Sequence, residues 1–553
     1  MHRSWVAALA VALSFTVTRR ARADQPRAPL PAAAARDASD GDDDDLVITD
    51  EDTDGRDDFE AFPLAVPHKP HVLRASLEVG GVLAVGFVDY LLNTSARGGE
   101  QRAGDERWAL RYDWPDLRGK FTGSAYELDN NRFGTNYASH PFAGTLYYTA
   151  ARSNHLSIPE SFLFAAFGST MWEYFGEIRE KVSVNDMVVT PMSGAAIGEA
   201  TMQLWGFFRR GRRSVPNAIF AFLASPVASI NAWTDGDGDP LRARDTNELG
   251  FPAEPWHRFT LEAGFGATSV SAVTAREPNR SYADQRLGLD LAIANLPFYD
   301  DRGRVARVFS DGNASRISIE TAWSRGDLVH GVFSTRVMPA GLYIRDAGDP
   351  DAPDDAPVRG STVLVGLLLG FEYGTHLYDR DGARPRDMIA YVSPVGVGGE
   401  VSWRDGELGV RASLDVSGTL GGVNAYGLSD YLATRSEAGL LTTTREQGYY
   451  HGLGVSLAPG VEVTWGPVDA SANMRLDTFR PLGGLDSDAG NVDYRIRFAD
   501  QRTRLRADLG LRLPGTPVRA GVTAQRMVRH GDVGDAHATR SETSLWGSLG
   551  VIF

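Results

Sequence analysis

From about Trp256 to the C-terminus, apolar side chains recur at every second position. The run ELGVRASLDVS (residues 407–417) places leucine, valine and alanine on one face and charged or small residues on the other, and TRLRADLGLRL (503–513) repeats this split. Successive side chains of a β-strand point to opposite faces of the sheet. The second half of the chain is therefore predicted to form β-strands with one apolar and one polar face.

Such alternation also fits a soluble β-sandwich, but three features favour a barrel in a membrane. The apolar faces end in aromatic residues such as Trp323, Trp403 and Trp465, as an interfacial girdle would. The polar faces mix Arg, Asp and Glu with Gly, which suits a polar lumen. The terminal run SLWGSLGVIF resembles the assembly signal of bacterial outer-membrane barrels, with five residues in phase: Leu545, Gly547, Leu549, Val551 and Phe553.

The turns indicate antiparallel pairing and an approximate strand number. Short turns are expected at Asp405-Gly406, at Gly466-Pro467 and at 514–516, because Gly and Pro favour tight connections. Long loops are expected between them, at 419–450, 479–490 and 529–540, with 491–513 as one long strand carrying a bulge near 500–503. We predict a transmembrane antiparallel β-barrel over 251–553 in the outer membrane of a Gram-negative cell, with about twelve strands and fourteen as the alternative.

The first 66 residues carry features of export. Residues 1–23 have a basic start, a short apolar core and Ala21-Arg22-Ala23, which predict a signal peptide cleaved before Asp24. Residues 24–66 are rich in Pro, Ala and Asp and are expected to form a disordered acidic tether. Within it, Leu46 to Thr49 (46–49) is a four-residue β-prone island that could add a strand to a periplasmic partner, although a chance cluster is the simpler interpretation.

Composition removes several classes of function. The chain of 553 residues has no cysteine and a formal charge of -15. Disulfides, thiolate chemistry and cysteine-ligated metals are therefore excluded, and nucleic acid is not expected as a partner. The expected partners are outer-membrane lipid and the barrel assembly machinery.

The acidic run at 235–239 imitates a calcium loop but has Thr246 where the loop needs Glu, so an acidic turn is expected. No metal or cofactor is predicted.

Residues 67–250 follow a different period and predict a helical domain. The expected helices cover about 140–153, 157–181, 186–210 and 215–230, with a capping box of Ser157 and Glu160 opening the second and a bend at Pro191 in the third. Small residues at Gly194, Ala195 and Gly198 would permit close helix contact. The uncharged runs are too short for comfortable membrane spans, so the helices are expected inside the barrel mouth or beneath it, as a plug or a support.

Carboxylates interrupt this apolar region. On the helix 157–181, Ser169, Glu173 and Glu177 share a stripe, and Lys181 can pair with Glu177. Nothing nearby in sequence pairs with Glu173, and a buried unpaired carboxylate is costly. The candidate donors come from elsewhere in the domain: His140, Arg152, Tyr147, Tyr148 and Ser161.

A family resemblance covers the same region. The segment carries the ordered motifs NYASHP, GTLYYTAAR, STMWEYFGE, SVNDMVVTP and a final Gly-Glu. This pattern resembles the bacterial family known as domain of unknown function 3943, over about residues 129–200. Asn154-His155 departs from it, since a Gly is expected after Asn. The resemblance implies an outer-membrane-associated protein and assigns no catalytic residues.

Three functions remain open on the sequence. The first is a barrel with a structural or transport role, whose helical domain is held by a buried polar network of His140, Arg152, Ser169, Glu173, Glu177, Asp186 and Glu199. The second is an envelope lipid-modifying hydrolase or transferase, with His140 as base and Glu173 or Asp186 as its acid. The third is surface binding by the long loops. For the first, pore conductance is expected to be low and to rise when residues 24–250 are removed.

Overall fold

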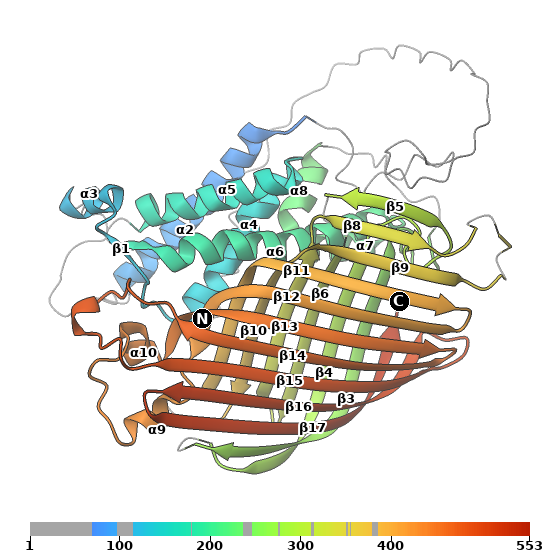
Figure 1. Ribbon diagram of the computed structural model, residues 1–553. Helices are drawn as coiled ribbons and strands as arrows, with labels where there is room; N and C mark the ends of the chain where they lie inside the picture. Colours follow the sequence, from blue (N-terminus) through green and yellow to red (C-terminus); the bar gives the residue numbers. More distant parts are fainter. Residues whose placement is uncertain are drawn as a thin grey trace, which may run out of the picture. The chain divides into compact units, whose positions relative to one another are not determined.

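A computed structural model describes residues 69–96, 114–177, 180–235, 246–274, 277–310, 314–349, 352–353, 356–378 and 385–553. The expected signal peptide, the acidic tether with its island at 46–49, and most of the acidic run at 235–239 lie outside these residues. The described part comprises a β-barrel formed by the second half of the chain and a set of helices formed by the first half (Figure 1).

Twelve strands close into an antiparallel barrel, which confirms the predicted fold and strand number. The ring closes because β17 pairs with β3 and β10 pairs with β11. In chain order the twelve are β3 (Trp256–Val273), β4 (Arg280–Ala294), β6 (Ala314–Ser324), β7 (Asp327–Met338), β10 (Leu369–Leu377), β11 (Arg386–Asp405), β12 (Leu408–Asn424), β13 (Tyr449–Trp465), β14 (Val468–Pro481), β15 (Phe498–Arg512), β16 (Val518–Val533) and β17 (Ala536–Ile552).

Three further short strands branch from the ring. They are β5 (Arg304–Phe309), β8 (Gly341–Asp346) and β9 (Arg359–Leu367). The first half of β11 pairs with β10 and its second half pairs with β9, so the wall forks along this one strand. The branch continues from β9 through β8 to β5.

The alternation of the strands separates an apolar outer face from a polar inner face. Leu261 and Phe265 of β3 are 53% and 73% exposed, whereas Glu262 between them reaches Arg519 across 3.0 Å. Leu549 near the end of β17 is 64% exposed on the same outer side. The outer face is therefore apolar and the charged side chains lie inside, as expected for a barrel that crosses a membrane.

The turns follow the prediction at one end of the barrel and depart from it at the other. Strand bounds confirm short turns at the three predicted places, although the first comprises 406–407 instead of 405–406, because Asp405 is still paired with Leu408. The long loop expected at 529–540 is wrong, because β16 continues to Val533 and β17 begins at Ala536. The predicted strand 491–513 begins only at Phe498. Charged residues that suggest a loop, such as Arg529 and Arg540, are buried in strands because the lumen supplies them with acids.

Ion pairs cross the lumen between strands that are not neighbours. Arg502 of β15 pairs across the lumen with Glu372 of β10, and it also pairs with Asp477 of the adjacent strand β14 at 2.6 Å. Further crossing pairs join β3 to β13, β7 to β12, β15 to β6 and β16 to β11: Arg258–Glu462 at 2.8 Å, Arg336–Asp415 at 2.7 Å, Arg506–Glu320 at 2.7 Å and Arg529–Asp387 at 3.2 Å. Side chains of the barrel itself thus occupy its interior.

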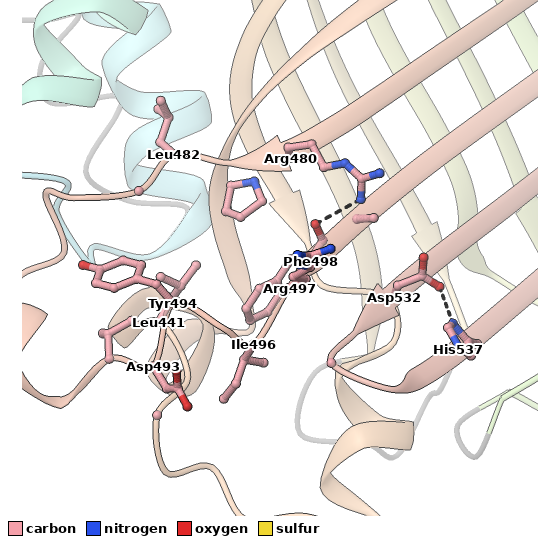
Figure 2. A pocket seen from close by; sticks show the side chains of 16 residues that line it. Leu441, Arg480, Leu482, Asp493, Tyr494, Ile496, Arg497, Phe498, Asp532 and His537 are labelled. Atoms are coloured by element: carbon pink, nitrogen blue, oxygen red, sulfur yellow. Dashed lines mark hydrogen bonds and ion pairs between the residues drawn. The ribbon is translucent and has the colours of Figure 1, made fainter.

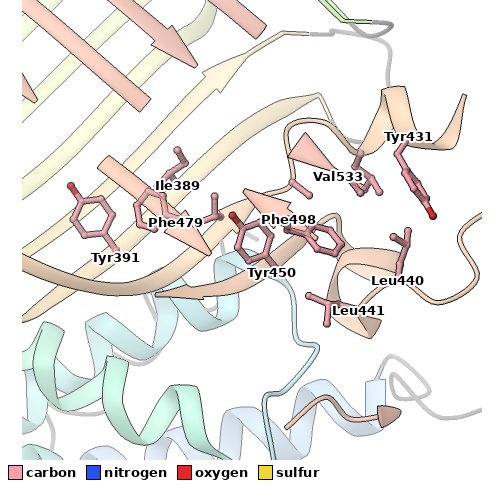
Figure 3. Close-up of a cluster of buried hydrophobic side chains, with 12 residues drawn as sticks. Ile389, Tyr391, Tyr431, Leu440, Leu441, Tyr450, Phe479, Phe498 and Val533 are labelled. Atoms are coloured by element: carbon pink, nitrogen blue, oxygen red, sulfur yellow. The ribbon is translucent and has the colours of Figure 1, made fainter. Parts of the chain in front are cut away.

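Apolar side chains seal the lumen at the end with the longer loops (Figure 3). Tyr391, Phe479 and Tyr450 come from three strands and meet residues of the loop between β12 and β13. That loop carries the short helices α9 (Leu428–Leu432) and α10 (Thr442–Gln447). The cluster comprises Ile389, Tyr391, Val423, Ala425, Leu428, Tyr431, Leu440, Leu441, Tyr450, Phe479, Phe498 and Val533.

The helical part contains α2 (Val72–Ala96), α3 (Trp114–Thr122), α4 (His140–Ser153), α5 (Ile158–Met171), α6 (Val184–Arg210), α7 (Val215–Ala224) and α8 (Pro226–Asp235). The capping box of Ser157 and Glu160 is confirmed at the start of α5. The expected helix 157–181 instead ends at Gly176, after a π-helical turn η2 (Trp172–Gly176) that follows α5. The expected helix 215–230 is two helices, because the chain turns at Ser225 before Pro226.

The helices lie against the outer wall of the barrel and not in its lumen. Phe207 of α6 packs on Phe259, which has the same orientation on β3 as the exposed Leu261. Nearer its start, α6 places Val189 among outward-facing residues that include Leu420 of β12. The described helices therefore do not form the expected plug. The reason is that the outer wall presents apolar side chains on which α6 can pack, whereas the lumen is lined by charged side chains.

Within the helical part, α4 and α6 touch through their backbones. A Cβ added at Gly144 would lie 2.0 Å from the carbonyl oxygen of Thr190, and one at Gly194 would lie 2.5 Å from the carbonyl oxygen of Gly144. Of the small residues predicted for close contact, Gly194 therefore occupies this crossing. It brings the beginnings of α4 and α6, and with them the polar residues described next, close together.

Candidate functional site

Three residues from three segments converge at one end of the helical part. His140 begins α4, Glu173 lies in η2 and Asp186 lies in the first turn of α6. One ligand atom from each of these residues lies within 4.8 Å of the other two, and His140 Nε2 is 3.6 Å from Asp186 Oδ2. Glu173 and Asp186 are buried, and the His140 side chain is 11% exposed. We call these three residues the acid–histidine cluster.

A local turn holds the two carboxylates of this cluster. Ser183 precedes α6 and caps it, because its hydroxyl accepts from the Asp186 backbone N–H at 3.3 Å. The same hydroxyl donates to Asp186 Oδ2 at 2.7 Å, and the Ser183 backbone N–H donates to Glu173 Oε2 at 2.8 Å. One residue therefore fixes both carboxylates. The π-helical turn at Glu173 is of a kind that recurs at functional sites.

Amide side chains form a second layer around Asp186. Asn185 donates to Asp186 Oδ1 at 3.1 Å and to Asp129 Oδ1 at 3.3 Å. Asn136 also donates to Asp129, and to the hydroxyl of Tyr449 in β13 at 3.0 Å. The layer thus connects the cluster with the outer face of the barrel.

A histidine on the barrel wall completes this connection. His451 of β13 contacts the hydroxyl of Tyr137 at 2.7 Å through Nδ1 and the backbone carbonyl of Asp129 at 2.8 Å through Nε2. Thr443 of α10 donates to the same carbonyl at 3.1 Å. Asp129 therefore links the surroundings of the cluster to the beginning of β13 and to α10, which lies in the loop between β12 and β13.

Burial shifts the pKa values of all three residues of the cluster. Burial raises the pKa of Glu173 to about 8 and raises that of Asp186 well above its usual range. It lowers the pKa of His140, an effect that nearby Asp129 opposes. Lys120 donates to the backbone carbonyls of Glu173 and Glu177 at 2.5 and 2.7 Å. Among the described residues, neither Glu173 nor Asp186 forms an ion pair with lysine or arginine.

The second oxygen of Glu173 is exceptional. Glu173 is fully buried, and its Oε1 has no hydrogen-bond donor among the described residues. Buried polar atoms in folded proteins nearly always have a partner. An acceptor without a donor, on a carboxylate that lies within 4.8 Å of a histidine and a second acid, is an arrangement that a bound cation would satisfy.

The residues predicted to form one polar network fall into two groups. His140, Ser169, Glu173 and Asp186 meet at the cluster, where the Ser169 hydroxyl donates to the Asp186 carbonyl at 3.1 Å. Glu177 lies beside them and accepts from Trp172 Nε1 at 2.9 Å. Lys181, expected to pair with Glu177, pairs with Glu127 instead at 2.7 Å, because the helix ends before Lys181.

Arg152 and Glu199 form the second group on α4 and α6. Arg152 Nε lies 2.9 Å from Glu199 Oε2, which also accepts from Tyr148 at 2.7 Å. Gln203 donates to Glu199 Oε1 at 2.8 Å. Each oxygen of Glu199 has a donor, so this group satisfies itself and fixes the contact between the two helices.

Several residues around the cluster escaped the sequence analysis. Asn136 and Asn185 lie in the motifs NYASHP and SVNDMVVTP, but these motifs assign them no role, whereas Asp129 and His451 lie in none of the motifs and His451 is more than 250 residues from the others. Ser183, three residues before Asp186, has the expected pattern of a helix cap, but that local pattern does not reveal its contact with Glu173.

A separate cavity opens at the loop end of the barrel (Figure 2). It has a volume of about 510 Å³ and is lined by residues of the loop between β14 and β15, including Tyr494 and Arg497. Arg480 donates to the Phe498 carbonyl at 3.3 Å along one wall, and His537 contacts Asp532 at 2.8 Å along another. The cavity does not include the acid–histidine cluster.

Solved structures resemble the barrel only weakly. The in-vitro folded OmpT of Vibrio cholerae is 8% identical, with 54% of this chain and 98% of that chain covered and a TM-score of 0.18. A Pseudomonas aeruginosa FadL homologue is 8% identical, with 53% and 90% covered and a TM-score of 0.23. The beta domain of the Bordetella autotransporter Brka is 12% identical, with 53% and 98% covered and a TM-score of 0.20. No curated protein matches the sequence.

A family model matches the helical part. The family is described as a domain of unknown function (DUF3943), and the match covers residues 125–227. This range includes α4, α5, α6 and α7 together with every member of the acid–histidine cluster. The resemblance predicted from the sequence motifs is confirmed by this match, which is limited to the helical region that carries the cluster.

Proposed function

We propose that the protein is an outer-membrane β-barrel with a closed lumen, whose helical domain is a lateral support attached to the outer wall. The observation that carries this proposal is the packing of α6 on outward-facing side chains of the barrel. The 27 residues of α6 give a helix of about 40 Å, enough to follow the height of a membrane-spanning wall.

The outer surface of the helices supports a partnership with membrane lipid. Exposed side chains on α2, α5 and α7 include Leu77, Phe167 and Leu223, which are 68%, 56% and 70% exposed. The segment Val72–Leu92 is long and apolar enough to cross a membrane, and only 11% of its apolar window is buried. Apolar surface of this extent favours lipid over water. Acyl chains are accordingly the proposed neighbours of these helices.

Two protein partners belong to the same proposal. The barrel assembly machinery would recognise the terminal strand β17, whose last residues keep the expected outward phase. A periplasmic partner could receive the island at 46–49 by strand addition. Both follow from placement in the outer membrane.

Conductance in planar bilayers tests the closed lumen. The intact protein is expected to conduct poorly, because crossing ion pairs and the apolar seal occupy the interior. Arg475 of β14 pairs with Glu372 of β10 at 2.9 Å, as Arg502 of β15 also does. Replacing both arginines by Ala removes two crossing side chains and is expected to raise conductance. Because the helices lie outside, removing them is no longer expected to open the pore. A porin-like conductance of the intact protein would contradict the proposal.

Truncation of the α6 contact tests the support role. Phe207→Ala would leave a cavity against Phe259 and is expected to destabilise the protein by about 3 to 5 kcal/mol. Phe167→Ala on α5 is a matched control, since Phe167 is 56% exposed. The temperature at which the folded barrel loses its faster gel migration measures both variants. Equal temperatures would show that the helices do not stabilise the wall.

An envelope lipid-modifying hydrolase or transferase is the second candidate. The observation that favours it is the 3.6 Å contact between His140 Nε2 and Asp186 Oδ2, since a histidine oriented by a carboxylate can act as a general base. Ester or phosphodiester bonds of envelope lipids would be the substrates. His140→Ala separates the candidates: an assembled barrel that loses a lipid-modifying activity favours catalysis, and a barrel that fails to assemble favours the structural role.

A further inference from the structure

We propose that His140, Glu173 and Asp186 bind one divalent transition-metal ion of the zinc class. This inference goes beyond the proposed function and is compatible with either candidate. It depends on donor geometry, on the residues that orient the donors, on the unpartnered oxygen of Glu173 and on the balance of charge.

The spacing of the donors fits a metal centre. Zinc bonds to histidine nitrogen and carboxylate oxygen are about 2.0 to 2.2 Å long, so a tetrahedral centre places two donors roughly 3.4 Å apart. His140 Nε2 and Asp186 Oδ2 are 3.6 Å apart. No two of the three donor atoms are more than 4.8 Å apart. A small movement of Glu173 would bring its oxygen to the donor-to-donor separation of a tetrahedral centre.

The surroundings orient the donors as the second layer of a metal site does. Ser183 donates its hydroxyl to Asp186 Oδ2 and its backbone N–H to Glu173 Oε2. Asn185 donates to the other oxygen of Asp186. These bonds hold two carboxylates in place and leave Glu173 Oε1 as an acceptor without a donor among the described residues.

Charge supplies the next argument. Two carboxylates and a histidine are buried together, with no described lysine or arginine paired to Glu173 or Asp186. Isolated buried carboxylates are unfavourable unless they are protonated, paired or bound to a metal. One divalent cation would neutralise both acids and satisfy the free oxygen of Glu173 at the same time.

The donor types select the kind of metal. Calcium and magnesium prefer oxygen donors alone, so an imidazole donor argues for a transition metal. The chain has no cysteine, and the donor set is one nitrogen and two oxygens. Three protein donors leave a tetrahedral ion one position for water or another ligand.

Zinc binding by the full-length protein in detergent tests the proposal. The protein is treated with a chelator, reloaded with Zn²⁺, freed of excess metal and analysed for zinc per chain. We expect one zinc ion per chain, and at least a tenfold weaker affinity in Glu173→Gln and in Asp186→Asn. X-ray absorption of the zinc-loaded protein should show one imidazole among oxygen donors.

Two matched controls and one independent readout keep the test decisive. Glu160→Gln and His537→Ala change exposed residues of the same types and are expected to bind zinc as the unaltered protein does. Zn²⁺ should raise the melting temperature of the unaltered protein and not that of Glu173→Gln, which keeps the acceptor for the Ser183 N–H. Absence of zinc, or equal zinc in Glu173→Gln and the unaltered protein, would mean adventitious binding and overturn the proposal.

Discussion

The lumen of the barrel and the acid–histidine cluster are both buried and polar, yet they treat carboxylates differently. In the lumen, Asp477 lies 2.6 Å from Arg502, and Asp500 lies 2.5 Å from Arg529. In the cluster, Glu173 and Asp186 receive hydroxyl and backbone donors and have no described ion pair with lysine or arginine. A carboxylate paired with arginine holds the wall together, whereas one without a cation is free to take a ligand.

The helical domain contains both kinds of carboxylate, which makes the comparison internal. Glu199 accepts hydrogen bonds from Arg152, Tyr148 and Gln203. In having an arginine partner it resembles the carboxylates of the lumen. Glu173, on a neighbouring segment, keeps one oxygen without a donor. Substituting each glutamate by glutamine therefore separates the structural from the ligand-binding role within one domain.

The largest effect is expected in the lumen. Asp477→Ala leaves Arg502 buried with Glu372 as its remaining acidic partner among the described residues, and breaking a buried pair costs about 3 to 5 kcal/mol. Denaturant titration of the detergent-solubilised barrel, followed by loss of β-structure, measures the change. Asp493→Ala, which lies in an exposed loop, is the control. A loss below about 1 kcal/mol would show that lumen charges are hydrated.

A smaller loss is expected for Glu199→Gln. The substitution removes the charge that faces Arg152 and should destabilise the helical domain by about 2 to 3 kcal/mol. Limited proteolysis between α4 and α6 reports on it, because separation of the helices exposes their linker. Unchanged protection would remove the distinction between Glu199 and Glu173.

The contact that brings the cluster together is expected to tolerate no added methyl group. Gly144→Ala places a Cβ 2.0 Å from the Thr190 carbonyl oxygen and should cost about 1 to 3 kcal/mol. Gly80→Ala is the matched helical control, since nothing lies within 4 Å of its added Cβ. Thermal unfolding of both variants, with zinc affinity as a second readout, tests the prediction. Equal stability would contradict the backbone contact.

The smallest effect is expected for Glu173→Gln in the absence of metal. The variant removes a buried acid without a cation and keeps an acceptor for Ser183, so stability should change by less than about 1 kcal/mol or increase. Unfolding in chelator compares it directly with Glu199→Gln. A loss as large as that of Glu199→Gln would show that Glu173 is a structural residue.

The strands were predictable from the sequence because the polarity of each residue indicates whether its side chain faces outward or into the lumen. Leu408 to Val416 alternate with polar residues, and the ring follows from that period and from short turns such as Asp405-Gly406. The tight turn near Val533 was not predictable. Charged residues such as Arg529 and Arg540 suggest an exposed loop in the sequence, and only the structure shows that acids on other strands pair with them inside the barrel. The capping pattern of Ser157 predicted the start of α5 for the same local reason.

The placement of the helices and the full extent of the cluster depend on contacts distant in sequence. His140, Glu173 and Asp186 were identified as candidates individually, but their meeting depends on the crossing at Gly144 and Gly194. The contact between Tyr137 and His451 joins residues 314 positions apart. The attachment of α6 to the outer wall was missed because its apolar residues fit equally well against a lumen or a wall.

The seam between the first and last strands of the ring gives the helical domain a particular place in the order of assembly. The backbone of Phe259 exchanges hydrogen bonds with Phe553, the last residue, at 3.1 and 2.9 Å, and Phe207 packs on the Phe259 ring. The helices precede the strands in the chain, yet the wall beneath α6 is complete only when β17 has paired with β3. The apolar face of α6 thus reaches its final contact only after the ring has closed.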